Sequence, residues 1–251
     1  MDENGMKDRE VLVFKDIKEI AGFLQKRWSE IAKDSIEKRN RFVIALSGGN
    51  TPIKVYQELV RSDKRFPWNK AHVFLVDERF VPFNDPESNY RMIKENLLKE
   101  LDIPPGNIHP IYIKDTSLST ALEYAESINR FFQLGEGDLP VFDLIMLGIG
   151  GDGHTASLFP GHEALHEKKR LTHAVNKDGL KNERITITLP VINNTREIIF
   201  LATGKDKAGI VKEVIEGESA DLPASIVQPK NGKMTFVLDK DASLLLKGER
   251  S

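Results

Sequence analysis

The stretch that decides the fold is "RFVIALSGGNTP", residues 41–52. It begins with a continuous apolar run with β-branched members, which predicts a strand buried on both faces. Two glycines end the run. Thr51 and Pro52 then predict a helix start, with Thr51 as the N-cap and Pro52 in the first helical position. A buried strand that passes through a glycine turn into a helix is the building unit of α/β proteins.

The same unit recurs along the chain. Buried strands are predicted at "HVFLVDERF" (72–80) and "FDLIMLGIGG" (142–151). Further strands are predicted at Val11–Phe14, "RITITLPVIN" (184–193), "REIIFLATG" (196–204) and "KMTFVLDKDAS" (233–243). Apolar residues at helical spacing predict helices over residues 17–38, from Met92 to Leu101, from Leu122 to Phe132 with Gly135 as the stop, and over residues 205–217.

This alternation predicts an α/β fold with a doubly wound, mainly parallel sheet. No repeat or long linker interrupts it, so residues 1–251 are expected to form one domain. A (β/α)₈ barrel also fits the length but ranks second, because strands and helices stop alternating between residues 149 and 200.

Composition narrows the function classes. The formal net charge is −2, which indicates neither a nucleic-acid nor a membrane partner. The chain has no cysteine, which excludes disulfides and thiolate chemistry. The polar, acidic residues 1–11 are not expected to be a signal peptide, and no apolar run approaches the roughly 18 residues that span a bilayer. A cytoplasmic location is therefore expected.

Polar residues follow four of the predicted strands at their carboxyl ends. They are Ser47–Thr51, Asp77–Arg79, Gly148–His154 and Thr203–Lys207. Ligands bind at the carboxyl ends of the strands in open α/β sheets. These four clusters are therefore expected to converge on one site.

The glycines of residues 148–153 fit the pattern G-x-G-x-x-G, which could indicate a dinucleotide site. Such a site needs a long helix directly after the glycines and an acidic residue about 20 positions on, after a strand. Here Pro160-Gly161 interrupts the segment, and Asp178 has no clear strand before it. A tight turn that brings backbone N–H groups close to a ligand explains the glycines better.

Asp152 and His154 are candidates for acid–base chemistry. A carboxylate beside an imidazole can fix its tautomer and stabilise its protonated form. The alternative is a solvated loop histidine, which the surrounding glycines make less attractive. A metal site is not expected, because His162 and His166 lie beside a Pro-Gly stretch without a nearby second carboxylate cluster.

The other clusters suit an anion, with ordinary alternatives still open. Ser47–Thr51 leads into a helix N-terminus, which favours phosphate but is also a common βα turn. Arg184 and Lys207 could complete a phosphate clamp or be surface charges. Asp77 and Arg79 could contact a substrate or form an internal ion pair.

Five segments, in this order, resemble the 6-phosphogluconolactonases of the pentose phosphate pathway and together span most of residues 44–229. They are "ALSGGNTPIKVYQEL" (45–59), "VFLVDERFVPFNDPESNYRMI" (73–93), "FDLIMLGIGGDGHTASLFPGH" (142–162), "ERITITLPVINNTREIIFLATGKDKA" (183–208) and "PASIVQP" (223–229). The resemblance implies a fold similar to that of glucosamine-6-phosphate deaminase and ribose-5-phosphate isomerase.

The related deaminases share several of these motifs. After the histidine they continue with an Asn-Glu-Pro segment, whereas this chain reads "TASLFPG" (155–161). They typically carry Asp-Glu-Tyr, whereas this chain has Asp-Glu-Arg at residues 77–79. Both differences favour the lactonase.

The resemblance implies hydrolysis of 6-phospho-D-glucono-1,5-lactone to 6-phospho-D-gluconate, with no metal or organic cofactor and a phosphosugar lactone as the partner. His154 would activate water and Asp152 would orient it. The expected substrate-binding residues are Ser47, Gly48, Gly49, Thr51, Asp77, Arg79, Gly150, Gly151, Arg184 and Lys207. The alternatives are a glucosamine-6-phosphate deaminase and a non-catalytic module that senses sugar phosphates. The oligomeric state is left open.

Overall fold

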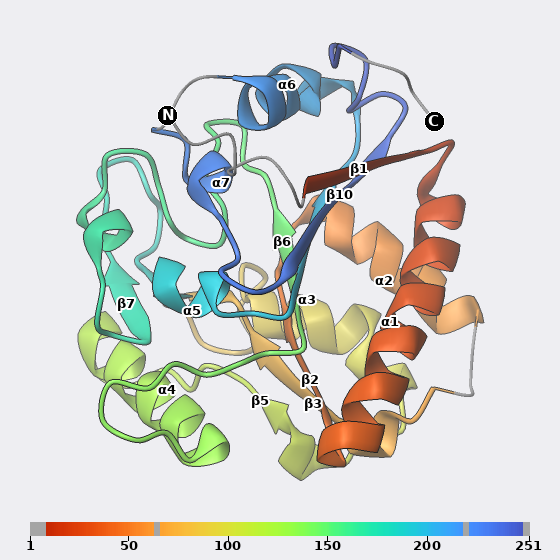
Figure 1. Cartoon of the computed structure of the whole chain (residues 1–251). Coiled ribbons are helices and arrows are strands. Elements are labelled where there is room, and N and C mark those ends of the chain that lie inside the picture. Colours follow the sequence, from red (N-terminus) through yellow and green to blue (C-terminus); the bar gives the residue numbers. More distant parts are fainter. Residues whose placement is uncertain (1–8, 63–65, 218–220, 248–251) are drawn as a thin grey trace.

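The structure is a computed structural model that describes residues 9–62, 66–217 and 221–247 (Figure 1). Its main feature is a seven-stranded parallel sheet in the order β1-β10-β9-β6-β2-β3-β5. The strands are β1 Arg9–Phe14, β2 Phe42–Leu46, β3 Ala71–Leu75, β5 Ile108–His109, β6 Leu144–Gly148, β9 Glu197–Ala202 and β10 Lys233–Asp239. The predicted α/β class with a mainly parallel sheet is confirmed. The sheet is open, so the barrel alternative is wrong.

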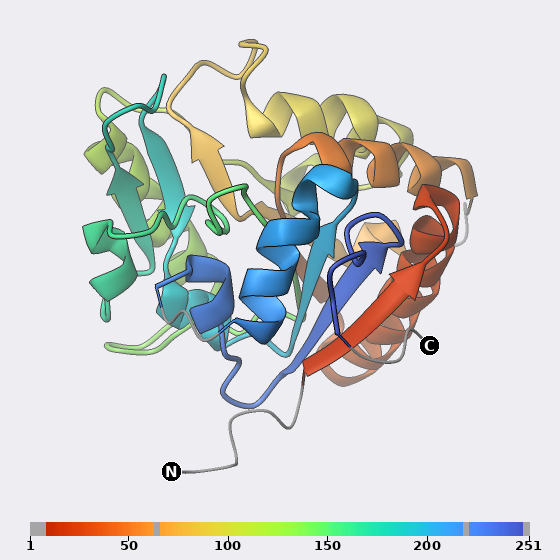
Figure 2. The ribbon, with the colours of Figure 1, turned by 90° about the horizontal axis from the view of Figure 1, so that it is seen from above.

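Helices cover both faces of this sheet. The α-helices are α1 Ile17–Arg39, α2 Asn50–Ser62, α3 Asn89–Asn96, α4 Ser117–Phe132, α5 Leu189–Asn193, α6 Ala208–Glu216 and α7 Pro223–Ile226. Short 3₁₀ helices are η2 Trp68–Lys70, η3 Leu98–Glu100, η4 Pro105–Asn107, η5 Glu163–His166 and η6 Lys205–Lys207. Figure 2 shows α1 and α6 on opposite faces. Within the described ranges, no helix is both long enough and apolar enough to cross a membrane.

A second, smaller sheet was not predicted. The segment "HVFLVDERF" is divided: β3 ends at Leu75, and β4 (Asp77–Arg79) pairs antiparallel with β8 (Arg184–Ile187). Val76 lies at the division, because its N–H donates to Leu46 O and its carbonyl accepts from Ile187 N, both at 3.0 Å. The third strand of this sheet is β7, Thr172–Val175, which is antiparallel to β8.

Several other element boundaries differ from the expectation. "RITITLPVIN" is a strand only to Ile187, because Leu189-Pro190 begins α5 with Thr188 as the N-cap. The helix predicted from Met92 to Leu101 ends at Asn96 and is followed by η3. The helix α2 begins at Asn50, so Thr51 lies in its first turn and is not its N-cap.

The end and the buried face of α4 also differ. Gln133, with φ of 55°, takes the left-handed C-cap position that was expected near Gly135. Leu122 is 53% exposed. The buried side chains are Thr120, Ala121, Tyr124 and Ile128, so the core-facing stripe begins with a threonine that apolar periodicity does not register.

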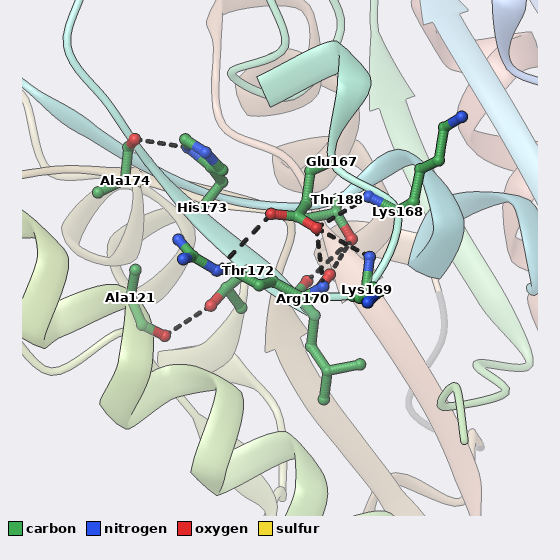
Figure 3. Close-up of polar contacts among 10 residues, drawn as sticks. Ala121, Glu167, Lys168, Lys169, Arg170, Thr172, His173, Ala174 and Thr188 are labelled. Carbon is green, nitrogen blue, oxygen red and sulfur yellow. Dashed lines mark hydrogen bonds and ion pairs between the residues drawn. The ribbon is translucent and has the colours of Figure 1, made fainter. Parts of the chain in front are cut away.

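The loop before β7 is organised by one carboxylate (Figure 3). Glu167 Oε1 accepts from three consecutive backbone N–H groups, those of residues 168–170, at 2.8–3.0 Å. These hydrogen bonds lower the pKa of Glu167, and the one from Lys169 N contributes most to the shift. Thr172 Oγ1 donates to Ala121 O of α4 at 2.6 Å, and Thr188 Oγ1 donates to Arg170 O at 2.7 Å. The small sheet is thereby attached to α4 (Figure 3).

Two histidines form a half-buried pair at the β3–β5 edge of the large sheet. His72 Nδ1 and His109 Nε2 are 3.2 Å apart, and the His109 ring stacks on Phe74 with centroids 4.1 Å apart. Burial, and then the neighbouring His72, lower the pKa of His109 to about 4. Burial and the charge of Arg41 also lower the pKa of His72.

This pair predicts a loss of stability in mild acid. Because the folded-state pKa of His109 lies below the ordinary histidine value of 6.5, the unfolded chain binds more protons between pH 6.5 and about 4. The stabilisation is complete above pH 6.5 and is lost as the pH falls. Between pH 7 and pH 5 the free energy of unfolding should fall by about 1 kcal/mol more in the wild type than in His109→Phe, allowing for solvent screening of a half-buried ring. Urea unfolding at both pH values measures the difference, and equal losses would contradict it.

Candidate active site

A pocket of about 700 Å³ lies at the carboxyl ends of the central strands, where the four predicted clusters converge. The predicted site residues that line it are Ser47, Gly48, Gly49, Thr51, Asp77, Arg79, Gly150, Gly151, His154 and Lys207. Asp152 and Arg184 do not line it, but each adjoins a residue that does. Sequence reasoning missed the pocket residues Lys54, Asn89, Asp239 and Asp241.

The first wall is the turn from β2 into α2. Ser47 Oγ donates to Met146 O at 2.6 Å, and Tyr56 OH donates to Ser47 O at 3.0 Å, so this serine fastens β2 to β6 and to α2. Gly49 has φ of +114°, which side chains rarely tolerate. Thr51 Oγ1 lies 3.0 Å from Thr203 Oγ1, which joins this turn to the end of β9. The first-turn N–H groups of α2 therefore stand at the pocket, where they favour an anion.

The second wall is the glycine turn after β6, which carries His154. Two backbone hydrogen bonds close the turn, from Gly153 N to Gly150 O at 3.0 Å and from Gly150 N to His154 O at 2.8 Å. The ring of His154 packs against Phe159 with centroids 4.7 Å apart, and its side chain is 34% exposed. The turn thus presents a fixed but accessible imidazole to the pocket.

Asp152 sets the tautomer of that imidazole. His154 Nδ1 lies 2.5 Å from Asp152 Oδ1, and His154 N donates to the same oxygen at 3.1 Å. Partial burial raises the pKa of Asp152, but the hydrogen bonds and charge of His154 outweigh it and the pKa is lowered. A carboxylate only accepts, so Nδ1 carries a proton, and in the neutral imidazole Nε2 is left as an acceptor.

Gly48 and Gly150 leave space for side chains of the pocket, in addition to the expected approach of the backbone to a ligand. A Cβ on Gly150 would lie 2.0 Å from His154 Nδ1, and a Cβ on Gly48 would lie 1.9 Å from Asn89 Oδ1. At both positions the missing side chain makes room for another side chain of the pocket. The imidazole can therefore occupy its observed position only because residue 150 has no side chain.

The two adjacent acids of β4 have different surroundings. Glu78 is fully buried and accepts from the N–H groups of Arg79, Asn89 and Tyr90 and from Ser88 Oγ, at 2.6–3.0 Å. Burial raises the pKa of Glu78 and these bonds oppose the shift. The carboxylate anchors the N-terminus of α3, because it satisfies N–H groups that have no partner within the helix.

Asp77, by contrast, lines the pocket and is bound by uncharged donors. Ser157 Oγ donates to Asp77 Oδ2 at 2.6 Å, and Asn89 Nδ2 donates to Asp77 Oδ1 at 3.3 Å and to its backbone carbonyl at 3.0 Å. The internal ion pair considered for Asp77 and Arg79 is not present among the ion pairs of the described residues.

Arg79 and Arg184 are opposite each other in the β4–β8 register. Arg79 Nη1 donates to Glu87 O at 2.6 Å. Among the described residues, the Nε atoms of both side chains are buried without a hydrogen-bond partner. Burial, and then the charge of Arg79, lower the pKa of Arg184. Two guanidinium groups at the pocket edge with unused donors favour an incoming anion.

Lys207 brings a further cation to the pocket. Its Nζ donates to Ile149 O at 3.0 Å, so the β9–α6 turn is tied to the turn that carries His154. Asp239 supports this arrangement from β10, because its two carboxylate oxygens accept from Gly204 N at 3.0 Å. Arg79, Arg184 and Lys207 therefore bring positive charge to this side of the pocket, where the carboxylates of Asp77, Asp206 and Asp239 also lie.

Comparison with known proteins identifies a family. The model of "Glucosamine-6-phosphate isomerases/6-phosphogluconolactonase" matches residues 15–236. A 6-phosphogluconolactonase of Synechocystis sp. is 42% identical over 211 residues, which are 83% of this chain and 86% of that protein. One of Rattus norvegicus is 37% identical over 243 residues, 94% and 93% of the two chains.

Solved structures agree. The 6-phosphogluconolactonase from Trypanosoma cruzi is similar with a TM-score of 0.84 and 31% identity, over 98% of this chain and 100% of that chain. A monomeric glucosamine-6-phosphate deaminase is similar with a TM-score of 0.77 and 23% identity, over 94% and 100% of the two chains, and it shares the fold.

The close approach of Gly150 and the imidazole predicts that adding a methyl group at position 150 displaces the ring. In Gly150→Ala the new Cβ would overlap His154 Nδ1, so the ring should turn away and its hydrogen bond to Asp152 should be lost. Gly151→Ala is the matched control, since no atom of the described residues beyond its chain neighbours lies within 4 Å of a Cβ there. Crystal structures of both variants measure the ring position. A ring that keeps its Asp152 contact in Gly150→Ala would show that the overlap is not decisive.

Proposed function

The chain belongs to the glucosamine-6-phosphate isomerase/6-phosphogluconolactonase family and hydrolyses 6-phospho-D-glucono-1,5-lactone to 6-phospho-D-gluconate, and we propose that His154 is the base for this reaction. The observation that carries the proposal is the hydrogen bond from His154 Nδ1 to Asp152. It leaves Nε2 as an acceptor on a ring that lines the pocket.

The reaction needs a base and then an acid at nearly the same place. His154 Nε2 takes a proton from water while the water oxygen attacks the C1 carbonyl carbon of the lactone. Collapse of the tetrahedral intermediate breaks the bond from C1 to the ring oxygen, and protonated His154 returns the proton to that oxygen. Asp152 stabilises the imidazolium formed in between. Backbone N–H groups of the glycine turn stabilise the oxyanion.

The 6-phosphate binds at the other wall of the pocket. The first turn of α2 offers backbone N–H groups, and Lys207 offers a positive charge near the turn that carries His154. Arg184 and Arg79 supply further donors at the edge. Binding energy from the phosphate holds the C1 carbonyl near His154, so a remote contact contributes to the rate.

The pocket favours lactone hydrolysis over deamination. Residues 155–157 after the histidine are Thr, Ala and Ser, so this segment supplies no further carboxylate for ring opening. The third alternative, a sensing module, would bind the phosphosugar without turnover. The cytoplasmic location, the lack of nucleic-acid and membrane partners, and the single domain over residues 1–251 stay predictions.

Turnover of the wild type tests the reaction. It should hydrolyse 6-phosphogluconolactone above the spontaneous rate and should release no ammonia from glucosamine 6-phosphate. His154→Ala should lower kcat about 10²–10⁴-fold, the usual contribution of one general base, with a much smaller change in KM. Initial rates corrected for spontaneous hydrolysis measure this. Near wild-type turnover in the variant would remove His154 from the mechanism.

The proposed phosphate site is tested by removing its positively charged side chains one at a time. Arg184→Ala and Lys207→Ala should each raise KM for the phosphorylated lactone about tenfold, the effect of one lost contact between charged groups. KM for unphosphorylated glucono-1,5-lactone should change little. Lys205→Ala is the matched control, because Lys205 is on the same turn, is exposed and does not line the pocket. Unchanged KM in either clamp variant would exclude that residue from the phosphate site.

A further inference from the structure

We propose that Asp77 accepts a hydrogen bond from a ring hydroxyl of the substrate, and that Ser157 and Asn89 are the positioning residues that hold its carboxylate for this purpose. The pocket would then recognise a polyhydroxylated ring as well as a phosphate. This inference rests on the proposed function, since the ring belongs to the same lactone.

The surroundings of Asp77 indicate a ligand contact rather than a purely structural role. The residue is 8% exposed, lines the pocket and is held by a serine hydroxyl and a side-chain amide. A buried carboxylate is costly unless it is well satisfied. Its two oxygens can accept about four hydrogen bonds, and side chains of the described residues supply two. The Asp77 carboxylate can therefore accept a further hydrogen bond from a donor in the pocket.

Glu78 is the natural comparison because it is the next residue in the chain. It is fully buried, receives four hydrogen bonds and does not line the pocket. Its acceptor capacity is used to hold α3. Adjacent carboxylates on the same strand therefore have separate tasks, and the one with remaining capacity is the one that faces the pocket.

Ser157 lies on the same short segment as the proposed base. Ala156 between them has φ of 52°, which is rare for a residue other than glycine. Leu158 N donates to Thr155 O at 2.9 Å, which closes a turn over residues 155–158. This turn directs the Ser157 hydroxyl to Asp77 while His154 lines the pocket. A hydroxyl bound by Asp77 is thus positioned relative to the imidazole.

Asn89 connects the same carboxylate to the glycine turn of α2. It is 2% exposed, donates to Asp77 through Nδ2, and has its Oδ1 against Gly48. The amide therefore lies between Asp77 and the turn proposed to bind phosphate. Its two contacts fix the distance between these parts of the pocket.

Substrates that lack one hydroxyl provide the test. The probes are the 2-deoxy, 3-deoxy and 4-deoxy forms of 6-phosphogluconolactone, compared with the parent lactone by kcat/KM. In the wild type, one of the three should lose about tenfold or more, because the buried Asp77 acceptor is then left without its donor. If all three are hydrolysed as efficiently as the parent, Asp77 accepts no hydrogen bond from a ring hydroxyl and the inference is wrong.

Variants assign the effect to the positioning residues. Ser157→Ala and Asn89→Ala should each lower kcat/KM for the parent lactone about tenfold and should reduce the penalty for the sensitive deoxy lactone. The matched control is Ser88→Ala, which removes a hydroxyl that donates to Glu78 Oε2 at 3.0 Å but does not line the pocket. It should lower stability and leave the penalty for the deoxy lactone unchanged.

The outcomes separate this inference from the proposed function. A wild type that does not hydrolyse the parent lactone contradicts the proposed function. A wild type that hydrolyses it, with a deoxy penalty that Ser157→Ala and Asn89→Ala leave intact, overturns the positioning roles alone. If a variant does not fold, the deoxy series is measured on Asp77→Asn, where the penalty for the sensitive deoxy lactone should become smaller. A penalty that is the same as in the wild type would show that Asp77 does not bind the hydroxyl.

Discussion

The reversal of strand order between β2 and β6 is the constraint on which the pocket depends. From β2 the chain builds outward to β3 and β5, while β6, β9, β10 and β1 lie on the other side. The connections that leave these neighbouring strands therefore diverge and leave a crevice at their carboxyl ends. The glycine turns after β2 and β6 form the two walls of that crevice.

Close approach between backbone and side chains gives the crevice its chemistry. The imidazole of His154 lies where a Cβ on Gly150 would be, and the amide of Asn89 lies where a Cβ on Gly48 would be. Each glycine thus has a partner that uses the vacant space. The arrangement is rigid because the turns are closed by their own hydrogen bonds, and rigidity keeps a catalytic group within reach of its target.

The small sheet brings the remaining groups to the same edge. When the chain leaves the large sheet at Val76, β4 carries Asp77 and Arg79 past the pocket and pairs with β8, which carries Arg184. Glu78 holds β4 in this position because its carboxylate accepts hydrogen bonds from the N-terminus of α3. A single crossing between sheets therefore supplies both the proposed hydroxyl acceptor and the cations near the proposed phosphate site.

The sequence by itself determined the large parallel sheet and most helices, because apolar runs, periodicity and glycine turns are local signals. It also located the Asp152–His154 pair, whose partners are two residues apart. Only the tertiary structure decided that β4 joins a second sheet, that Arg79 faces Arg184, and that Ser157 and Asn89 hold Asp77. Ser157 and Asp77 are 80 residues apart in sequence, and no local pattern records a contact between two segments that meet only when the chain folds.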